Sequence, residues 1–249
     1  MKQEYTRDGY YLIQGSFSDE NVNTLRNELS NIEGKPNNFG IRDLMNKVPY
    51  IKRMASSSPL VDIARKILGD NARPVRSVFF DKIEGANWNV AWHQDTSIAL
   101  KTKHEINGFG PWSEKQGMIH AEPPAEYLAS TLTLRIHLDK ANNETGALRV
   151  VPGTHRDGRV KSSEILKIVE NSTVVECCAD PGDVLLMNPL LFHSSRKAIN
   201  PYHRRIIHIE YSAMELPAPL EWFECAQTLL TKHYSCRDKL GTLGFPGTG

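Results

Sequence analysis

Hydrophobic and polar positions alternate along the middle of the chain, and this alternation predicts β structure. From Ser130 to Asp139, leucine or isoleucine at every second position alternates with threonine, arginine or histidine. Because neighbouring side chains of a strand point to opposite sides, this run has one apolar and one polar face. Further strand-like runs, separated by turn residues, are Ala147 to Val151, Val184 to Met187 and Arg204 to Tyr211. Such strands predict a mainly β protein, a double-stranded β-helix (a cupin-like jelly roll) whose mouth holds a ligand.

The beginning of the chain shows helical periodicity instead. A short strand over residues 9–13 precedes a helix that Ser18 can cap and that ends before Gly34. A second helix is predicted from Ser58, its N-cap, to Gly69. We expect both helices to pack on the outer sheet. Their apolar positions at helical spacing are Val22, Leu25, Leu29 and Ile32 in the first and Leu60, Ile63, Ile67 and Leu68 in the second.

One domain is the natural organisation for a chain of 249 residues. We expect an N-terminal helical cover over about 1–74, a jelly-roll core over about 75–215 and a C-terminal extension over about 216–249. The end, from Gly241 to Gly249, is rich in glycine and is expected to be a loose tail.

Composition and charge exclude several classes of function. The formal net charge of +1 provides no general field for nucleic acid or an anionic membrane. No apolar run approaches the ~20 residues of a membrane-spanning helix, and the first five residues, Met1 to Tyr5, lack the apolar h-region of a signal peptide. The cysteines, Cys177, Cys178, Cys225 and Cys236, form no Cys-x-x-Cys motif, which is typical of reduced thiols. We therefore expect a cytoplasmic protein, monomer or homodimer, with neither nucleic acid nor membrane as partner.

A pair of metal-ligand residue types stands at His93 and Asp95. Residues i and i+2 of a strand share a side, so both side chains can reach one ion. A strand histidine beside a surface carboxylate would look the same. His193 ends an apolar run and can complete two histidines and one carboxylate, a set that leaves open positions on Fe(II) for a bidentate co-substrate and O2. Arg204, eleven residues later, can bind a carboxylate in a forked, bidentate manner.

The motifs taken together resemble the phytanoyl-CoA dioxygenase family of Fe(II)/2-oxoglutarate oxygenases. The resemblance implies that His93, Asp95 and His193 bind iron and that Arg204 anchors the co-substrate 2-oxoglutarate. It also implies that Ser195 and Trp112 assist around the co-substrate. The residues that carry the resemblance, over nearly the whole chain, are Asp8-Gly9-Tyr10, His93-x-Asp95, Thr145-Gly146-x-Leu148, Val151-Pro152-Gly153-Thr154-His155, Pro181-Gly182-Asp183, His193 and Arg204.

The function that the resemblance implies is oxidation of a small organic substrate with O2, releasing succinate and CO2. Relatives that halogenate have a small residue in place of the carboxylate, so Asp95 favours hydroxylation or desaturation. The family name does not identify the substrate of this chain. Two other functions use the same residues: a non-catalytic metal-binding jelly-roll sensing module, and a Zn(II) hydrolase. An arginine placed for a dicarboxylate argues against both.

Several residues could be mistaken for members of the site. Arg205 also lies in the last strand, but it shares its side with apolar residues, whereas Arg204 shares its side with His208 and Glu210. Arg135, on the polar face of its strand, is expected to line the pocket. The remaining histidines have no partner at ligand spacing, and we take His155 as a structural residue and His104, His120, His203, His208 and His233 as satisfied or solvated side chains.

A long stretch from Thr96 to Glu126 directly follows the predicted metal-binding strand. It shows no regular period, and connections of this length are usually functional. We expect an irregular lid in which Phe109 and Trp112 cover the substrate and Gly108 allows movement.

Overall fold

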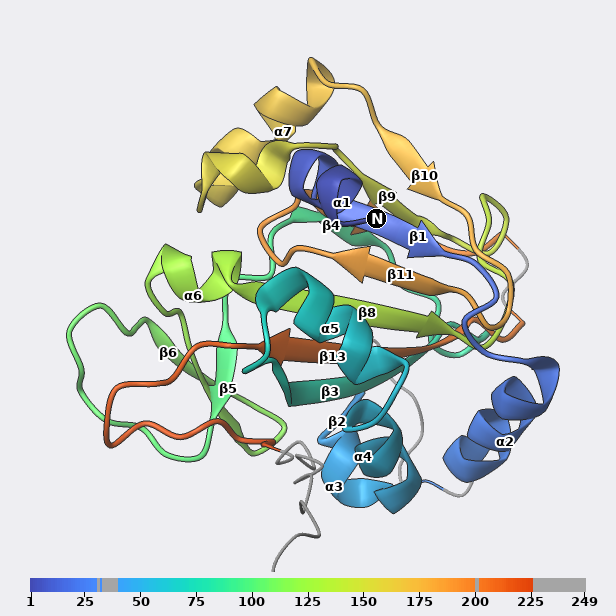
Figure 1. Ribbon diagram of the computed structural model, residues 1–249. Helices are drawn as coiled ribbons and strands as arrows, with labels where there is room; N and C mark the ends of the chain where they lie inside the picture. The colour runs from blue at the N-terminus through green and yellow to red at the C-terminus, as the bar shows by residue number, and fades with distance from the viewer. Residues whose placement is uncertain (31, 33–39, 200–201, 226–249) are drawn as a thin grey trace, which may run out of the picture.

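The computed structural model describes residues 1–249 except 31, 33–39, 200–201 and 226–249. The predicted tail from Gly241 to Gly249 lies outside the described residues. The main architecture is a jelly roll of antiparallel strands with helices outside it (Figure 1), which confirms the predicted fold class.

A six-stranded antiparallel sheet forms the larger wall of the jelly roll. Its middle strand, β8, pairs with β11 on one side and with β13 on the other. Strands from the beginning, middle and end of the described chain thus lie side by side, as a jelly roll requires. In order across the sheet, the strands are β1 (Tyr10–Ile13), β11 (Val184–Met187), β8 (Thr131–His137), β13 (Arg205–Ser212), β3 (Arg73–Asp81) and β2 (Ile41–Arg42).

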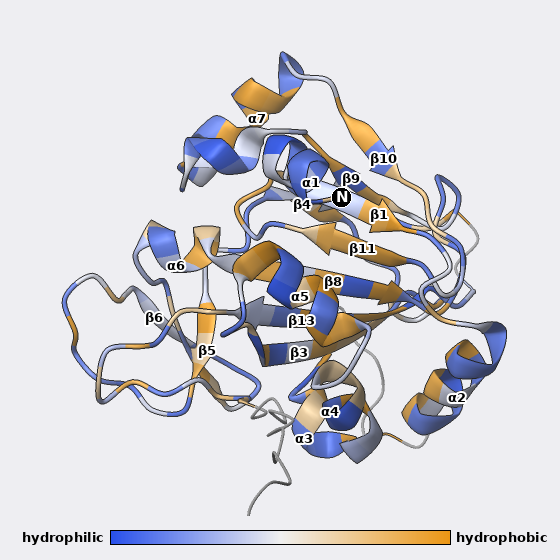
Figure 2. Cartoon of the chain, viewed as in Figure 1, coloured by the Kyte–Doolittle hydropathy of each residue, from blue (hydrophilic) through white to orange (hydrophobic). Residues whose placement is uncertain are grey.

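Helices from the N-terminal part of the chain cover the outer face of this sheet, as predicted. Leu132, Leu134 and Ile136 of β8 point outward and pack with apolar helical residues in one buried cluster. Figure 2 shows the mixture of hydrophobic and hydrophilic positions along β8 and the covering helices. The Ser18 hydroxyl caps its helix by accepting a hydrogen bond from the amide of Asn21 (3.3 Å). The helices are α1 (Lys2–Asp8), α2 (Asp19–Ser30), α3 (Leu44–Lys47), α4 (Pro49–Ala55) and α5 (Leu60–Leu68).

A four-stranded sheet forms the smaller wall, and α7 (Ser162–Glu170) covers its outer side. The two sheets enclose an apolar core at one end, where Leu148 and Val150 contact Leu185 and Met187. The polar side chains of β8 point into the remaining space between the sheets, which leaves room for a site. In order, the strands are β10 (Val175–Cys177), β9 (Leu148–Val150), β12 (His193–Ser195) and β4 (Val90–His93).

The prediction of an irregular segment over 96–126 was wrong. This segment forms a three-stranded antiparallel sheet, followed by α6 (Ala125–Ala129). The strands are only three or four residues long and are separated by Gly and Pro, so no period of two is long enough to be read from the sequence. In order, they are β5 (Ile98–Leu100), β7 (Met118–Ala121) and β6 (Trp112–Lys115).

Two of the sequence motifs meet at one corner of the fold. Gly9 has a positive φ of 80°, and a Cβ placed on it would lie 2.4 Å from the His155 ring. The amide of Gly153 donates a hydrogen bond to the carbonyl of Asp8 (2.9 Å), so the two turns hold each other. His155 contacts the carbonyl of Thr6 (3.2 Å), as expected for a structural histidine.

Among the described residues, no helix is long and apolar enough to cross a membrane.

Tyr211 joins the covering helices to the large sheet, and its hydroxyl provides the first test. This fully buried residue of β13 donates a hydrogen bond to the carbonyl of Ala55 (2.7 Å) at the end of α4. In Tyr211→Phe the buried carbonyl loses its partner, which we expect to lower the free energy of unfolding by about 1–3 kcal/mol in urea denaturation. Tyr202→Phe, at a position that is 84% exposed, is the matched control. Equal stability of both variants and the wild type would show that this bond contributes nothing.

Candidate active site

The pairing of β4 with β12 brings two histidines together. In this antiparallel pair His193 lies directly opposite His93, and the ring centroids are 4.1 Å apart. The sequence places these residues far apart, and only the sheet register makes them neighbours. His193 is buried, whereas the side chain of His93 is 38% exposed, so the pair lies between the interior and the solvent.

Hydrogen bonds to the backbone fix which nitrogen of each ring is free. The Nδ1 atom of His93 lies 2.9 Å from the carbonyl of Ala91, and Nδ1 of His193 lies 2.8 Å from the carbonyl of Leu191. A carbonyl only accepts hydrogen bonds, so Nδ1 must carry the proton in both rings. The Nε2 atoms therefore keep their lone pairs for a metal.

Asp95 completes the group from a position just beyond the end of β4. The prediction that His93 and Asp95 lie in one strand was therefore wrong, because β4 ends at His93. The carboxylate oxygens of Asp95 nevertheless lie 3.7 Å from Nε2 of His93 and 3.6 Å from Nε2 of His193. The three potential ligand atoms lie within 4.8 Å of one another.

Gln94 holds this turn in place from the opposite side. Its amide nitrogen donates to the carbonyls of Gly158 (2.8 Å) and Leu190 (2.7 Å), and its amide oxygen accepts from the amide of Val160 (2.9 Å). All three contacts are made by a side chain that is only 6% exposed. With Gln94 anchored away from the cavity, its neighbours His93 and Asp95 face inward. This role of Gln94 was not predicted from the sequence.

The charges of the group suit a divalent cation. Burial alone would raise the pKa of the Asp95 carboxyl, but the histidines outweigh this effect and keep that pKa well below its usual range. Burial and the neighbouring His93 lower the pKa of His193 to about 3. At neutral pH the group thus offers a carboxylate and a neutral imidazole. The residues fit Fe(II), which two histidines and one carboxylate bind with open positions remaining.

Arg204 and Arg205 point to opposite sides of the large sheet. The Arg205 side chain forms two hydrogen bonds with the carboxylate of Asp139 (2.8 Å each), away from the cavity. Arg204 lines the cavity, is 4% exposed, and has no hydrogen-bond partner for Nε or Nη1 among the described residues. Burial and Arg135 lower the pKa of Arg204 to about 9. A buried guanidinium without a partner is costly, so this geometry favours an anionic ligand.

Ser195 and Lys82 lie at the same end of the cavity as Arg204. The Ser195 hydroxyl donates to the carbonyl of Gly146 (2.8 Å) and accepts from Nζ of Lys82 (2.8 Å). Lys82 also contacts the carbonyl of Arg196, and it is only 1% exposed. Burial and, to a lesser extent, the charges of Arg204 and Arg135 together lower the pKa of Lys82 to about 7. Ser195 was predicted from the sequence, whereas Lys82, which follows the last residue of β3, was not.

A chain of polar contacts crosses the middle of the cavity. Nη1 of Arg135 lies 3.2 Å from Nδ1 of His208, and arginine can only donate, so the proton of His208 is on Nε2. That nitrogen lies 3.2 Å from Glu210, whose carboxylate also accepts from Arg76 (2.8 Å). Arg135 lines the pocket as expected. His208 is a satisfied side chain outside the metal group, as expected, but it also lines the cavity, which its place two and four residues from Glu210 and Arg204 could have indicated.

The other lone histidines that the structure describes do not line the cavity. Nδ1 of His203 contacts the carboxylate of Asp81 (2.7 Å), and Nδ1 of His120 donates to the carbonyl of Met118 (3.0 Å). His104 contacts the hydroxyl of Thr102 (2.9 Å). His233 lies outside the described residues. None of the three described ones belongs to the metal group.

Trp112 does not lie in the cavity with the other predicted residues. It packs beside Phe109 in a buried cluster with Leu220 and Trp222 from the end of the described chain. Neither aromatic residue of the segment 96–126 therefore covers the metal group. From this segment, Ser97 and Lys115 are the residues that line the cavity.

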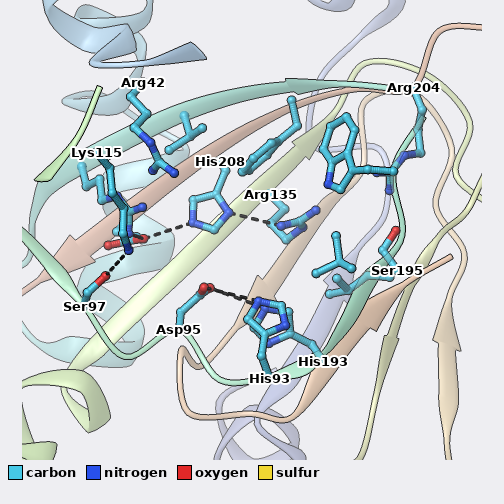
Figure 3. A pocket seen from close by; sticks show the side chains of 17 residues that line it. Arg42, His93, Asp95, Ser97, Lys115, Arg135, His193, Ser195, Arg204 and His208 are labelled. Atoms are coloured by element: carbon cyan, nitrogen blue, oxygen red, sulfur yellow. Dashed lines mark hydrogen bonds and ion pairs between the residues drawn. The ribbon is translucent and has the colours of Figure 1, made fainter. Parts of the chain in front are cut away.

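The cavity has a volume of about 240 Å³ and combines all these features. Figure 3 shows the metal group at its floor, Arg204 and Ser195 toward one end, and Arg42 and Lys115 toward the other. Its residues come mostly from β3, β4, β8, β12 and β13. They are Arg42, Arg76, Val78, Phe80, Trp88, Val90, His93, Asp95, Ser97, Lys115, Arg135, Leu148, His193, Ser195, Arg204, His208 and Glu210.

Known proteins share this sequence pattern and fold. The family model described as "Phytanoyl-CoA dioxygenase (PhyH)" matches residues 5–206. An ectoine dioxygenase of Sphingopyxis alaskensis is 24% identical over 264 residues, covering 88% of this chain and 79% of the relative. A probable alpha-ketoglutarate-dependent hypophosphite dioxygenase of Stutzerimonas stutzeri is 25% identical and covers 86% of this chain and 78% of that protein.

Solved structures show the same fold. EctD from S. alaskensis with 2-oxoglutarate and 5-hydroxyectoine has a TM-score of 0.65 and 21% identity, covering 84% of this chain and 74% of that chain. The non-heme alpha ketoglutarate dependent carbocyclase SnoK from nogalamycin biosynthesis has a TM-score of 0.65 and 17% identity, covering 84% and 81%.

The metal group generates a direct prediction. His93→Ala, Asp95→Ala and His193→Ala should each weaken Fe(II) binding by more than about 100-fold, because even residues that only support metal ligands contribute about 10- to 100-fold. Anaerobic equilibrium dialysis with Fe(II) measures the affinity, and circular dichroism checks the fold. His104→Ala is the control and should bind like the wild type. A variant of the three that retains wild-type affinity identifies a residue that is not a ligand.

Proposed function

The chain belongs to the phytanoyl-CoA dioxygenase family, and on that premise we propose that it oxidises a small organic substrate at an iron held by His93, Asp95 and His193. It is an Fe(II)- and 2-oxoglutarate-dependent dioxygenase, as its relatives are. What we propose beyond this is the assignment of residues and the kind of substrate oxidation, hydroxylation or desaturation.

The observation that carries the assignment is the guanidinium of Arg204, which lies in the same small cavity as the metal group and whose Nε and Nη1 atoms have no hydrogen-bond partner in the described part of the chain. 2-Oxoglutarate has a keto acid at one end, which can chelate a metal, and a carboxylate at the other. A forked guanidinium can bind that second carboxylate through two parallel hydrogen bonds. We assign Arg204 as this anchor, with Ser195 and Lys82 beside it. A Zn(II) hydrolase or a sensing module would need no such arginine.

Bound Fe(II) and 2-oxoglutarate supply the oxidising chemistry by activating O2. In hydroxylation, one oxygen atom of O2 enters the substrate, converting a C–H group into C–OH. The other enters succinate, which forms as 2-oxoglutarate loses CO2. The protein positions the reactants: Gln94 fixes the turn that bears two of the ligands, and Arg204 orients the co-substrate. Halogenating relatives have a small residue where this chain has Asp95, which leaves room for chloride. The carboxylate of Asp95 therefore favours hydroxylation or desaturation.

The substrate is a small molecule, and O2 is the other partner. Relatives named for ectoine and for hypophosphite match this chain about equally well, so their names support the reaction type rather than one substrate. Trp112, expected near the co-substrate, has no part in this proposal, because its cluster lies apart from the cavity residues. We also propose a cytoplasmic location, which the free cysteines Cys177 and Cys178 favour.

The two neighbouring arginines provide a matched test of the assignment. Arg204→Ala should weaken 2-oxoglutarate binding by more than about tenfold, because a charge-assisted hydrogen bond contributes about 1.5–3 kcal/mol. Arg205→Ala removes the same charge on the other face of β13 and should change that affinity by less than roughly twofold. Calorimetry with 2-oxoglutarate under anaerobic conditions measures both affinities. Equal losses in the two variants, or a larger loss in Arg205→Ala, would defeat the assignment.

A further inference from the structure

The cavity has a second basic end that the binding of 2-oxoglutarate does not use. Arg204 and Ser195 lie toward one side of the metal group, whereas Arg42, Lys115 and Ser97 lie toward the other (Figure 3). Arg76 belongs to this second end through Glu210, which it contacts at 2.8 Å. We call Arg42, Arg76 and Lys115 the basic end.

The basic end carries more positive charge than its surroundings neutralise. Arg76 forms an ion pair with the carboxylate of Glu210, which His208 also contacts, whereas Arg42 and Lys115 form no ion pair among the described residues. The carboxylate of Asp95 also acts on Arg42, and those of Asp95 and Glu122 act on Lys115, but only from a distance. The Nε and Nη1 atoms of Arg42 and the Nε atom of Arg76 are buried and have no hydrogen-bond partner among the described residues. Buried donors of this kind are usually satisfied by a ligand or by water. The basic end thus has the charge and the free donors to bind an anion.

The three cations also lie close enough to influence one another. Burial lowers the pKa of Arg42 to about 10, with Arg76 as the next cause. The pKa of Lys115 is lowered by burial, then by Arg76 and Arg42. Lys115 sits at the exposed mouth, where its Nζ donates to the Ser97 hydroxyl (3.3 Å). An anion at this end would relieve the repulsion among the three cations.

The size and polarity of the cavity restrict what a substrate can carry besides its anionic group. Its volume of about 240 Å³ must hold 2-oxoglutarate as well, and pockets for drug-sized ligands alone occupy about 300–1,000 Å³. Only five of the seventeen lining residues are apolar, and cationic side chains lie at both ends, so the cavity suits a polar molecule better than a long acyl chain. The substrate part within the cavity is therefore short and polar.

We propose that the primary substrate is a small organic acid whose anionic group, a carboxylate or a phosphonate, is bound by Arg42, Arg76 and Lys115. This inference rests on the proposed function and adds the substrate class to it. The basic end and the metal group share one small cavity, so the oxidised carbon is separated from the anionic group by only a few bonds.

Charge-matched probes test this proposal without knowledge of the substrate. The wild-type protein, loaded with Fe(II) and saturated with 2-oxoglutarate under anaerobic conditions, is titrated calorimetrically with propionate, methylphosphonate and the neutral propionamide. Saturation with 2-oxoglutarate keeps the probes away from Arg204. We expect at least one anion to bind and the amide not to bind. Binding of only one of the two anions identifies the anionic group as carboxylate or phosphonate.

Two variants locate the binding to the basic end. Arg42→Gln and Lys115→Gln should each weaken the binding of the anion by at least about tenfold. Arg53→Gln, at an exposed position on α4, removes the same charge outside the cavity and should match the wild type. No binding of either anion, equal binding of propionamide, or unchanged binding in both variants would overturn the inference. Failure of the wild type to bind 2-oxoglutarate in the preceding titration would instead overturn the proposed function.

Discussion

The antiparallel pairing of β12 with β4 is the constraint on which the site depends. It sets His193 opposite His93, and backbone carbonyls then hold both rings with Nε2 toward Asp95. A slip of this register by one residue would turn one histidine to the other face of the sheet. The three-point anchoring of Gln94 resists such a slip, because its contacts lie on the opposite side. The jelly roll thus acts on the chemistry mainly through one strand pair and the turn that follows it.

Uncompensated positive charge is the second property of the cavity. Arg204, Arg135 and Lys82 are all buried, and none of them forms an ion pair with a carboxylate in the part of the chain that the structure describes. A folded protein tolerates such an arrangement where a ligand completes it. The dicarboxylate 2-oxoglutarate would neutralise one end of the cavity, and an anionic substrate the other. Both inferences follow from this uncompensated positive charge, which the large sheet provides together with Lys115 of β6.

The strands and helices with a clear hydrophobic period, and the site residues at their ends, could be predicted from the sequence. The alternation along β8 and the apolar spacing of α2 and α5 were long enough to be read, and the face argument placed Arg204 inside and Arg205 outside, as the structure does. The short strands β5 to β7 had no readable period. The helix α7, with Ile165 and Ile168 on one side, carried a helical signal that was overlooked. Arg42, Arg76 and Lys115 could not be grouped from the sequence, because β2, β3 and β6 come together only through tertiary packing.

The proposed site requires that Fe(II) and 2-oxoglutarate meet on the group formed by His93, Asp95 and His193. Anaerobic addition of Fe(II) and then 2-oxoglutarate to the metal-free protein, followed by visible absorption spectroscopy, tests it most directly. We expect a new charge-transfer band that requires both additions, appears at a ratio of one iron per chain, and is absent when Zn(II) replaces Fe(II). A spectrum that does not change on adding 2-oxoglutarate to the iron-loaded protein would contradict the account.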